Sequence, residues 1–138
     1  MSIAPTGLTP LIQVYDMPEA IHFYCGMLGF DMVASSPEIE APEGRYCQWA
    51  WLRLGGADLM LNTAYDAGER PATRDAARWR GHGDTSLYIG CGDVDAVHAE
   101  LSARGLALQS ATIAPYGMKQ LHISDPDGYA ICFQAPIA

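Results

Sequence analysis

The same order of predicted elements occurs twice along this chain, and this repetition constrains the fold more than any other feature. In each copy one strand precedes a helix, and three strands follow it. The copies cover residues 8–64 and 85–135, and residues 65–84 connect them. A sheet with a single helix has one covered face and cannot complete its own core. We therefore expect an α+β fold, a single domain over residues 1–138, in which two tandem βαβββ modules pair their curled mixed sheets and enclose a pocket.

Two stretches carry the capping and spacing signals of helices. The first begins at Asp16, a good N-cap, and its apolar residues fall at helical spacing until Gly29, which is placed to stop the helix. The second stretch begins at Asp93 and ends at Gly105 in the same manner. These signals predict one helix in each module.

Turn residues delimit the predicted strands. Gly55-Gly56 is a strong hairpin signal, and Asp125-Pro126-Asp127-Gly128 is a second turn with its expected residues. Around these turns and the two helices we expect eight strands, at Leu8–Val14, Phe30–Ala34, Arg45–Leu54, Ala57–Thr63, Thr85–Gly90, Ala107–Thr112, Lys119–Ser124 and Tyr129–Gln134.

Composition and charge argue against several classes of protein. The formal charge of −8 speaks against a nucleic-acid partner, because phosphate binding needs clustered Lys and Arg. The chain has no apolar run of about 18 residues, and its N-terminus lacks the pattern of a signal peptide. We therefore expect a cytoplasmic protein with no membrane partner. Its four cysteines, without a C-x-x-C pair, indicate small buried side chains rather than disulfides or a zinc site.

One basic cluster departs from the acidic total. Four of the eight basic residues, Arg70, Arg74, Arg78 and Arg80, lie close together in the connection. A solvated loop or short helical turn is the ordinary interpretation of such a cluster. The alternative is a rim that attracts an anionic ligand. The sequence leaves open whether this segment covers the pocket, contacts a partner subunit or does neither.

Two motifs carry a resemblance to a known family. The first helix reads D-M-x-x-A-I-x-F-Y-x-x-x-L-G-F from Asp16 to Phe30, and the last hairpin reads S-D-P-D-G-Y-x-I-x-F from Ser124 to Phe133. Together with the βαβββ repeat, they resemble the vicinal oxygen chelate superfamily. This superfamily includes glyoxalase I, extradiol dioxygenases and the bleomycin-resistance proteins. The resemblance implies the fold over almost the whole chain, but fold analogy alone does not fix an activity.

The metal-dependent members of that superfamily place His and Glu ligands on the first and last strands of each module. The corresponding positions here are Thr9, Leu61, Ser86 and Cys132, with Asn62 in place of Leu61 if the register differs by one. Catalytic sites for transition metals use three or four imidazole or carboxylate donors, and leucine offers no donor at all. We therefore predict no metal and no cofactor.

Strand alternation extends these positions to a predicted organic pocket. Apolar walls with a few fixed polar groups suit a small organic ligand. Trp49 and Trp51 share one strand face and could either pack or form a stacking platform; a two-residue turn at Gly55-Gly56 would put them opposite Leu61 and favour packing. The predicted ligand-binding residues are Thr9, Leu11, Gln13, Leu59, Leu61, Ser86, Tyr88, Tyr116, Met118, Gln120, His122 and Cys132.

His122 is the one histidine that the pattern places for chemistry. A neutral imidazole facing the pocket could act as general acid or base near pH 7, or could simply hydrogen-bond a ligand. Cys132 on the neighbouring strand would need a lowered pKa to act as a nucleophile. The first hypothesis is a metal-free protein of the bleomycin-resistance type that sequesters an aromatic or amphipathic ligand as a homodimer. The alternatives are a metal-independent lyase, isomerase or cyclase using His122, and a metal-dependent glyoxalase- or dioxygenase-type enzyme.

Overall fold

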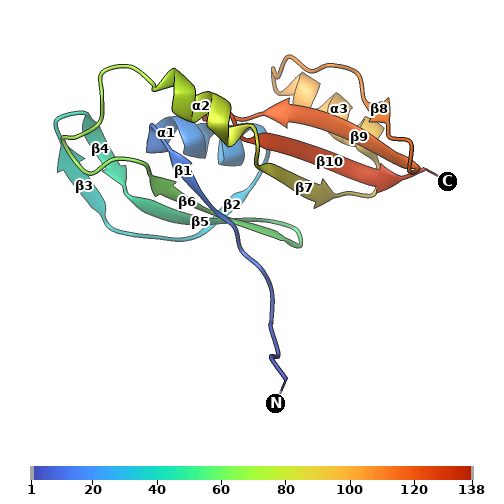
Figure 1. The fold of residues 1–138 in the computed structure, drawn as a ribbon, viewed down its shortest axis with the longest axis horizontal. Coiled ribbons are helices and arrows are strands. Elements are labelled where there is room, and N and C mark those ends of the chain that lie inside the picture. Colours follow the sequence, from blue (N-terminus) through green and yellow to red (C-terminus); the bar gives the residue numbers. More distant parts are fainter. Residues whose placement is uncertain (1, 138) are drawn as a thin grey trace. The chain divides into compact units, whose positions relative to one another are not determined.

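Two four-stranded sheets of the same topology form the framework of the computed structural model, which describes residues 2–137 (Figure 1). Their strand orders are β1-β6-β5-β2 and β7-β10-β9-β8. In each sheet the first neighbouring pair is parallel and the other two pairs are antiparallel. The predicted α+β class is confirmed. The strands of the two sheets are β1 (Leu11–Val14), β2 (Asp31–Ser35), β5 (Trp49–Leu54), β6 (Ala57–Thr63), β7 (Ser86–Gly90), β8 (Thr112–Ile113), β9 (Met118–Ser124) and β10 (Ala130–Pro136).

The chain divides into two compact units between Ala72 and Thr73. The first unit contains the sheet β1-β6-β5-β2, and the second contains the sheet β7-β10-β9-β8. The predicted connection over residues 65–84 is therefore shared, with its first part in the first unit and the rest in the second.

In the first unit a short helix covers one face of the sheet. Helix α1 (Met17–Ile21) begins at Asp16, whose carboxylate accepts a hydrogen bond from the Glu19 backbone N–H at 3.1 Å, as the capping signal predicts. A π-helical turn, η1 (His22–Met27), continues it. The sheet residues facing the helix form the core of this unit and are at most 3% exposed: Ile12, Val14, Ala50, Leu52, Leu59 and Leu61.

The first unit also carries a hairpin that the sequence did not reveal. The predicted strand Arg45–Leu54 is divided at Gln48 into β4 (Gly44–Cys47) and β5. Strand β4 pairs with β3 (Glu38–Ala41) in a separate two-stranded ribbon. The Ser36 hydroxyl accepts hydrogen bonds from the backbone N–H groups of Gln48 and Trp49 at 3.1 Å each, and these bonds hold the break. The prediction of one continuous strand is wrong for this reason.

In the second unit a longer helix covers the sheet. Helix α3 (Val94–Ala103) begins at Asp93, whose carboxylate accepts from the Ala96 N–H at 3.1 Å. The predicted strand Ala107–Thr112 is wrong in its extent, because only β8 at Thr112–Ile113 pairs with the sheet. The core of this unit consists of Val94, Leu101, Leu121, Ile123, Ile131 and Phe133, all buried.

A third helix, α2 (Ala76–His82), packs on the turn between β9 and β10. The Trp79 indole N–H donates to the Pro126 carbonyl at 3.0 Å, and the His82 ring stacks on Tyr129 with centroids 4.1 Å apart. At Gly128 the two backbones meet so closely that a Cβ atom there would overlap the Trp79 carbonyl oxygen. The helix therefore belongs firmly to the second unit.

The arginine cluster is distributed between the units. Arg70 lies 3.7 Å from the Asp16 carboxylate and over the Tyr15 ring at 4.9 Å, within the first unit. Arg74 lies 3.7 Å from Asp127, within the second unit. At least two of the four arginines, Arg70 and Arg74, are thus engaged in internal ion pairs, which favours the structural interpretation of the cluster over an anion-binding rim.

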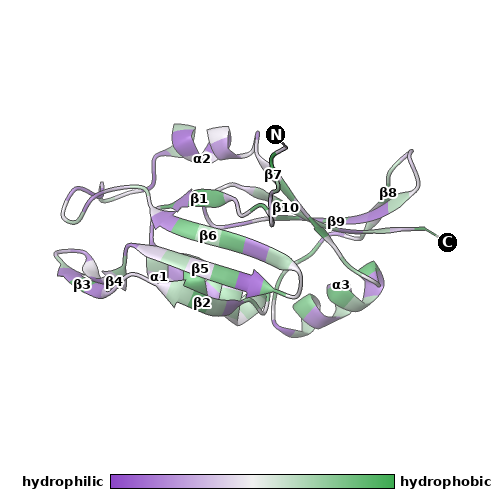
Figure 2. Ribbon diagram, turned by 90° about the horizontal axis from the view of Figure 1, so that it is seen from below, coloured by the Kyte–Doolittle hydropathy of each residue, from purple (hydrophilic) through white to green (hydrophobic). Residues whose placement is uncertain are grey.

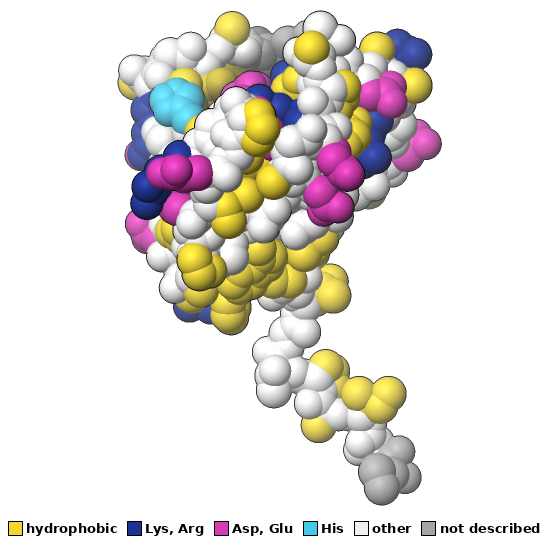
Figure 3. Space-filling view, turned by 90° about the vertical axis from the view of Figure 1, so that its left-hand side faces the viewer, with side chains coloured by type: hydrophobic (Ala, Val, Ile, Leu, Met, Phe, Trp, Pro, Cys, Tyr) yellow, Lys and Arg dark blue, Asp and Glu magenta, His cyan; other side chains and the backbone are white. Residues whose placement is uncertain are grey.

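The N-terminal segment before β1 is extended and exposed. Ile3 and Leu8 are 91% and 90% exposed. Figure 3 shows this segment projecting into the solvent. Across residues 2–137, each helix is too short or too polar to cross a membrane.

Candidate functional site

The sheet of the first unit has a face that α1 does not cover, here called the first open face (Figure 2). Its members follow from the strand register, because paired residues point to the same side of a sheet. Leu11 pairs with Met60, and Met60 pairs with Trp51. From β1, β5 and β6 the face takes Leu11, Gln13, Trp49, Trp51, Arg53, Asp58, Met60 and Asn62, and from the edge strand β2 it takes Asp31 and Ala34.

This register corrects the predicted orientation of β6. Leu59 and Leu61 were expected to share the pocket side with Leu11 and Gln13, but they are 3% and 0% exposed on the opposite, helix-covered face. Ile12, not Leu11, pairs with Leu61. The position that corresponds to a superfamily ligand in this strand is therefore Asn62, because a shift of one residue reverses every side chain of a strand.

The same correction changes the interpretation of the two tryptophans. The Gly55-Gly56 turn has two residues, since Leu54 pairs with Ala57, and Trp49 and Trp51 do lie opposite Leu61. Because Leu61 faces the helix, both indoles lie on the open face and are partly exposed. Packing of the two indoles under the helix is therefore wrong, whereas packing at a contact with a partner subunit stays a prediction.

Three residues at the hairpin end of this face form a polar cluster. The Asp58 carboxylate accepts from the Trp51 indole N–H at 3.2 Å and from the Arg53 guanidinium at 2.8 and 3.0 Å. The guanidinium also lies over the Trp51 ring, 5.5 Å from its centroid. The pKa of Asp58 is lowered, mainly because its carboxylate accepts hydrogen bonds from Arg53. Asp58 and Arg53 are therefore both ionised at neutral pH. Asp58 therefore holds the Trp51 ring at its N–H edge, and Arg53 covers one face of the ring.

A cavity of about 560 Å³ adjoins this cluster. Its walls are the polar cluster, the Gly55-Gly56 turn and residues 6–9, which include the predicted site residue Thr9. Further along the face, the Asn62 amide donates to the Gln13 side chain at 3.2 Å. Polar groups thus lie at both ends of a surface whose centre is formed by Trp51, Met60 and Leu11.

The sheet of the second unit has a corresponding face opposite α3, here called the second open face. Cys132 pairs with both Tyr88 and His122, and Gln134 pairs with Gln120. Seven predicted site residues therefore belong to this face or its edge: Ser86, Tyr88, Tyr116, Met118, Gln120, His122 and Cys132.

An amide network crosses the second open face. The buried Gln120 side chain donates from its amide nitrogen to the Tyr116 hydroxyl at 2.8 Å and to the side-chain amide oxygen of Gln134 at 3.1 Å. Tyr116 lies on the turn before β9, and its side chain is 68% exposed. The network therefore ties an exposed aromatic ring to the sheet through a single buried amide.

The two groups considered for catalysis have different environments. His122 is exposed. Cys132 is buried, its thiol donates to the Phe133 carbonyl at 3.7 Å, and burial raises its pKa. A thiol with a raised pKa is protonated at neutral pH and is a poor nucleophile. These contacts argue against a Cys132 nucleophile and leave the exposed His122 as the candidate that the sequence offered for acid–base chemistry.

The residues at the superfamily's ligand positions do not fit a transition metal. Thr9, Asn62 and Ser86 offer neutral oxygen atoms, and Cys132 offers a protonated thiol. Within residues 2–137, no three His, Cys, Asp or Glu side chains come together as a metal site would require. No chemical step is assigned to a metal.

The first open face holds residues that the sequence analysis missed. Asp58 and Met60 were absent from the predicted site because Leu59 and Leu61 were placed on the pocket side, and Arg53 was not considered. The signal was present, because Ile12 and Val14 are the apolar alternates of β1 and mark its inward face. If Ile12 and Val14 are taken to face the core, the two-residue turn places Trp51 beside Met60 on the opposite face.

Comparison with known proteins agrees with this fold. The model of the Glyoxalase/Bleomycin resistance protein/Dioxygenase superfamily matches residues 5–133. The chain belongs to this superfamily, which confirms the predicted resemblance. No curated protein matched the sequence.

Several solved structures cover nearly the whole chain. TnmS3, an antibiotic binding protein from Streptomyces sp. CB03234, is 29% identical over 99% of this chain and 100% of its own, with a TM-score of 0.66. A glyoxalase/bleomycin resistance protein from the same strain is 30% identical over 92% and 97%, with a TM-score of 0.60. The bleomycin-binding protein of Streptomyces verticillus, in complex with copper(II)-bleomycin, is 19% identical over 99% and 100%, with a TM-score of 0.69, and shows the shared fold.

Proposed function

We propose that this protein is a metal-free binding protein that sequesters an aromatic or amphipathic organic molecule on an open sheet face. The observation that carries this proposal is the placement of Trp49 and Trp51 on the first open face, beside Leu11 and Met60. Two partly exposed indoles on one side of a strand offer a large, rigid apolar surface at low entropic cost.

The polar groups of the two faces suit an uncharged or amphipathic ligand. On the first open face Arg53 and Asp58 pair with each other, and Asp31 of the edge strand β2 adds one carboxylate. The Gln13–Asn62 and Gln120–Gln134 pairs are neutral amides. Such groups orient a ligand by hydrogen bonds without demanding a charge. A phosphorylated or polyanionic ligand would find no clustered cations here.

Known relatives support an antibiotic as the ligand class. TnmS3 is described as an antibiotic binding protein, and its 29% identity extends over the whole chain. The donor set at the superfamily's ligand positions supports binding without a metal. We further propose that the protein acts as a cytoplasmic homodimer, which size-exclusion chromatography with light scattering would test at micromolar concentration.

A fluorescence titration tests the proposed function. The Trp79→Phe variant leaves Trp49 and Trp51 as the emitting tryptophans, and both lie on the first open face. We expect a panel of aromatic natural-product antibiotics, including copper(II)-bleomycin and the planar anthracycline doxorubicin, to contain at least one compound that quenches this emission with a micromolar or lower Kd. Calorimetry on the unmodified protein then provides the affinity.

Two outcomes would contradict the proposal. Tight binding of the panel compound with no change in Trp49 and Trp51 emission would remove the first open face from the site. One tightly held divalent ion per subunit, found by metal analysis of protein purified without chelators, would exclude the metal-free state.

A further inference from the structure

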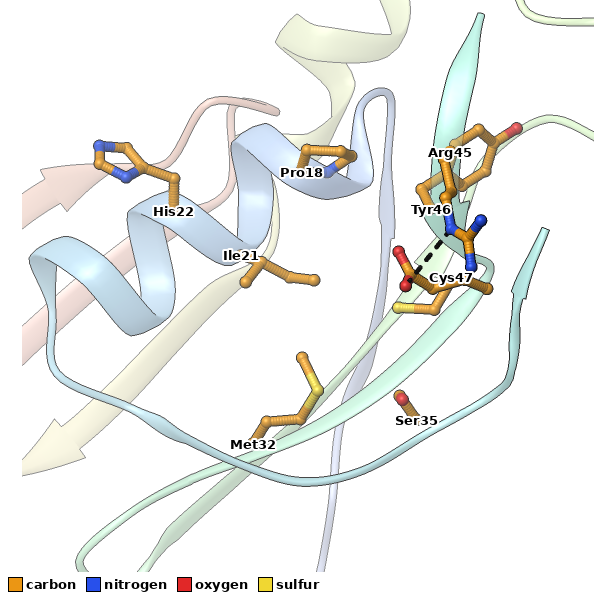
Figure 4. A pocket seen from close by; sticks show the side chains of 9 residues that line it. Pro18, Ile21, His22, Met32, Ser35, Arg45, Tyr46 and Cys47 are labelled. Atoms are coloured by element: carbon orange, nitrogen blue, oxygen red, sulfur yellow. Dashed lines mark ion pairs between the residues drawn. The ribbon is translucent and has the colours of Figure 1, made fainter. Parts of the chain in front are cut away.

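The first unit contains a second cavity, of about 570 Å³, that is separate from its open face (Figure 4). One wall is α1, the second is the edge strand β2, and the third is the β3–β4 hairpin. Met32 and Ser35 of β2 pair with Leu52 and Ala50, whose side chains belong to the helix-covered face. The cavity therefore opens on the opposite side of the sheet from Trp49 and Trp51.

The interior of this cavity is apolar. Ile21 from α1, Met32 from β2 and Cys47 from β4 point into the same space, whereas His22 points away from them (Figure 4). Cys47 is 7% exposed, and burial raises the pKa of its thiol, so the group is neutral at this wall. Such a lining suits an alkyl or aryl group.

The hairpin side of the cavity carries more carboxylates than guanidinium groups: Glu38 and Arg45 line the cavity, and Glu40 lies beside Arg45 just outside the lining. The Arg45 guanidinium lies 3.6 Å from Glu38 and 3.2 Å from Glu40, so two carboxylates share one guanidinium. The hairpin register places Glu38 beside Cys47 and Glu40 beside Arg45, which puts all four side chains on one side of the ribbon. The side chains of Glu38 and Glu40 are 58% and 82% exposed and can meet a further cation.

Charge and lining together define the occupant. We propose that this cavity is a second binding site, which takes a small organic cation with an apolar body. The alkyl or aryl part lies between Ile21 and Met32, and the ammonium group lies at Glu38. A carboxylate ligand is disfavoured, because Arg45 already serves two carboxylates. The proposal does not depend on the function proposed for the open faces.

Three probes of equal length test the charge preference. The probes 4-phenylbutylamine, 4-phenylbutan-1-ol and 4-phenylbutyrate differ only in the terminal group. Titrated into the isotope-labelled protein near pH 7, the amine is expected to move the backbone amide resonances of Ile21, Met32 and Cys47. We expect it to bind about fivefold more tightly than the alcohol, as one added ion pair at an exposed rim allows, and the carboxylate to bind most weakly. Equal affinities, or resonance changes confined to Trp49, Trp51 and Met60, would overturn the proposal.

A matched pair of variants tests whether Glu38 causes the preference for the amine over the alcohol. Glu38→Gln removes one charge without changing size, and we expect it to weaken amine binding to the level of the alcohol while alcohol binding stays the same. Glu69→Gln makes the same change at an exposed residue of the same unit that does not line the cavity, and it should leave all three affinities unchanged. An amine preference that survives Glu38→Gln contradicts the site.

Filling the cavity provides an independent measurement. Ser35→Phe should reduce binding of both the amine and the alcohol at least tenfold, because the new ring occupies the same space. If this variant does not fold, alkylation of Cys47 by N-ethylmaleimide in the unmodified protein is the second readout. Saturating amine should slow that alkylation several-fold, and an unchanged rate would overturn the proposal.

Discussion

The two units share one sheet topology but present different open faces. Strand β1 corresponds to β7, β6 to β10, β5 to β9 and β2 to β8, with α1 and α3 covering the equivalent sides. The first face carries two indoles and an internal Arg53–Asp58 ion pair. The second carries a histidine and an amide network that ends on the exposed Tyr116 ring. The same framework therefore supports a rigid aromatic surface in one unit and an adjustable hydrogen-bonding surface in the other.

The units also differ outside the sheets. The first has the β3–β4 hairpin between β2 and β5, where the second has only a tight turn closed by the Gly117 N–H donating to the Ala114 carbonyl at 3.0 Å. The second has α2 before its first strand, where the first has an exposed extended segment. Each unit thus has one addition, and each addition creates a contact or cavity that the other unit lacks.

The largest expected effect concerns the equivalent hairpin turns of the two sheets. Gly128 and Gly55 both have positive φ, at +87° and +55°, but a Cβ at Gly55 meets open space. Gly55→Ala should cost about 1 kcal/mol, the ordinary penalty of that backbone region. Gly128→Ala should cost about 3 kcal/mol or more, because the Trp79 backbone must move away. Urea unfolding of both variants measures the difference. Equal losses of unfolding free energy would show that α2 moves away from residue 128 without destabilising the fold.

The next effect concerns the aromatic residues of the two faces. Trp51 is held by Asp58 and Arg53, so it is ordered before a ligand arrives, whereas Tyr88 is 52% exposed on the second open face. Trp51→Ala should weaken binding of the antibiotic found by titration about 30-fold, the order expected for an aromatic anchor that the ligand covers, and Tyr88→Ala about threefold. Calorimetry provides both ratios. A larger loss for Tyr88→Ala would assign the main contact to the second unit.

A smaller effect comes from acid. The Asp58 pKa is lowered in the folded protein, so its ionised form stabilises the fold above about pH 4 and this contribution is lost as the pH falls through the lowered pKa. The melting temperature of the unmodified protein should therefore fall more between pH 6 and pH 3 than that of Asp58→Asn. Parallel curves would show that the Arg53–Asp58 pair contributes nothing to stability.

The smallest expected effect is that of His122→Ala. A hydrogen-bonding group at the exposed second face should change ligand affinity by threefold or less. Any conversion of the bound antibiotic, followed by chromatography and mass spectrometry, should be absent in both forms of the protein. Turnover by the unmodified protein that disappears in His122→Ala with affinity retained would establish the metal-independent enzyme instead.

Local signals in the sequence were sufficient for much of the fold. The Asp16 and Asp93 caps and the two hairpin turns each act within a few residues, and the helix starts and turns that they predict are present. The β3–β4 hairpin escaped because Arg45–Leu54 alternates like one strand, and the Ser36 hydroxyl that divides it comes from another segment.

The candidate site was predicted better in the second unit than in the first. The pairing of Cys132 with Tyr88 and His122 follows from the β9–β10 turn and the alternation around it. In the first unit Leu59 and Leu61 were oriented by the ligand position that the family resemblance assigned to Leu61, and the shift of one residue to Asn62 reverses the strand. The Arg53–Asp58–Trp51 cluster depends on that register, so it became visible only in the structure.

The repeated strand order has a consequence for the history of the chain. Two halves with the same order of parallel and antiparallel neighbours are the expected product of duplicating one ancestral half. The hairpin and α2 lie outside the shared four-stranded plan, so each could be inserted later without disturbing a sheet. Point substitutions on the open faces and insertions such as the β3–β4 hairpin and α2 are therefore two independent routes to a new binding specificity.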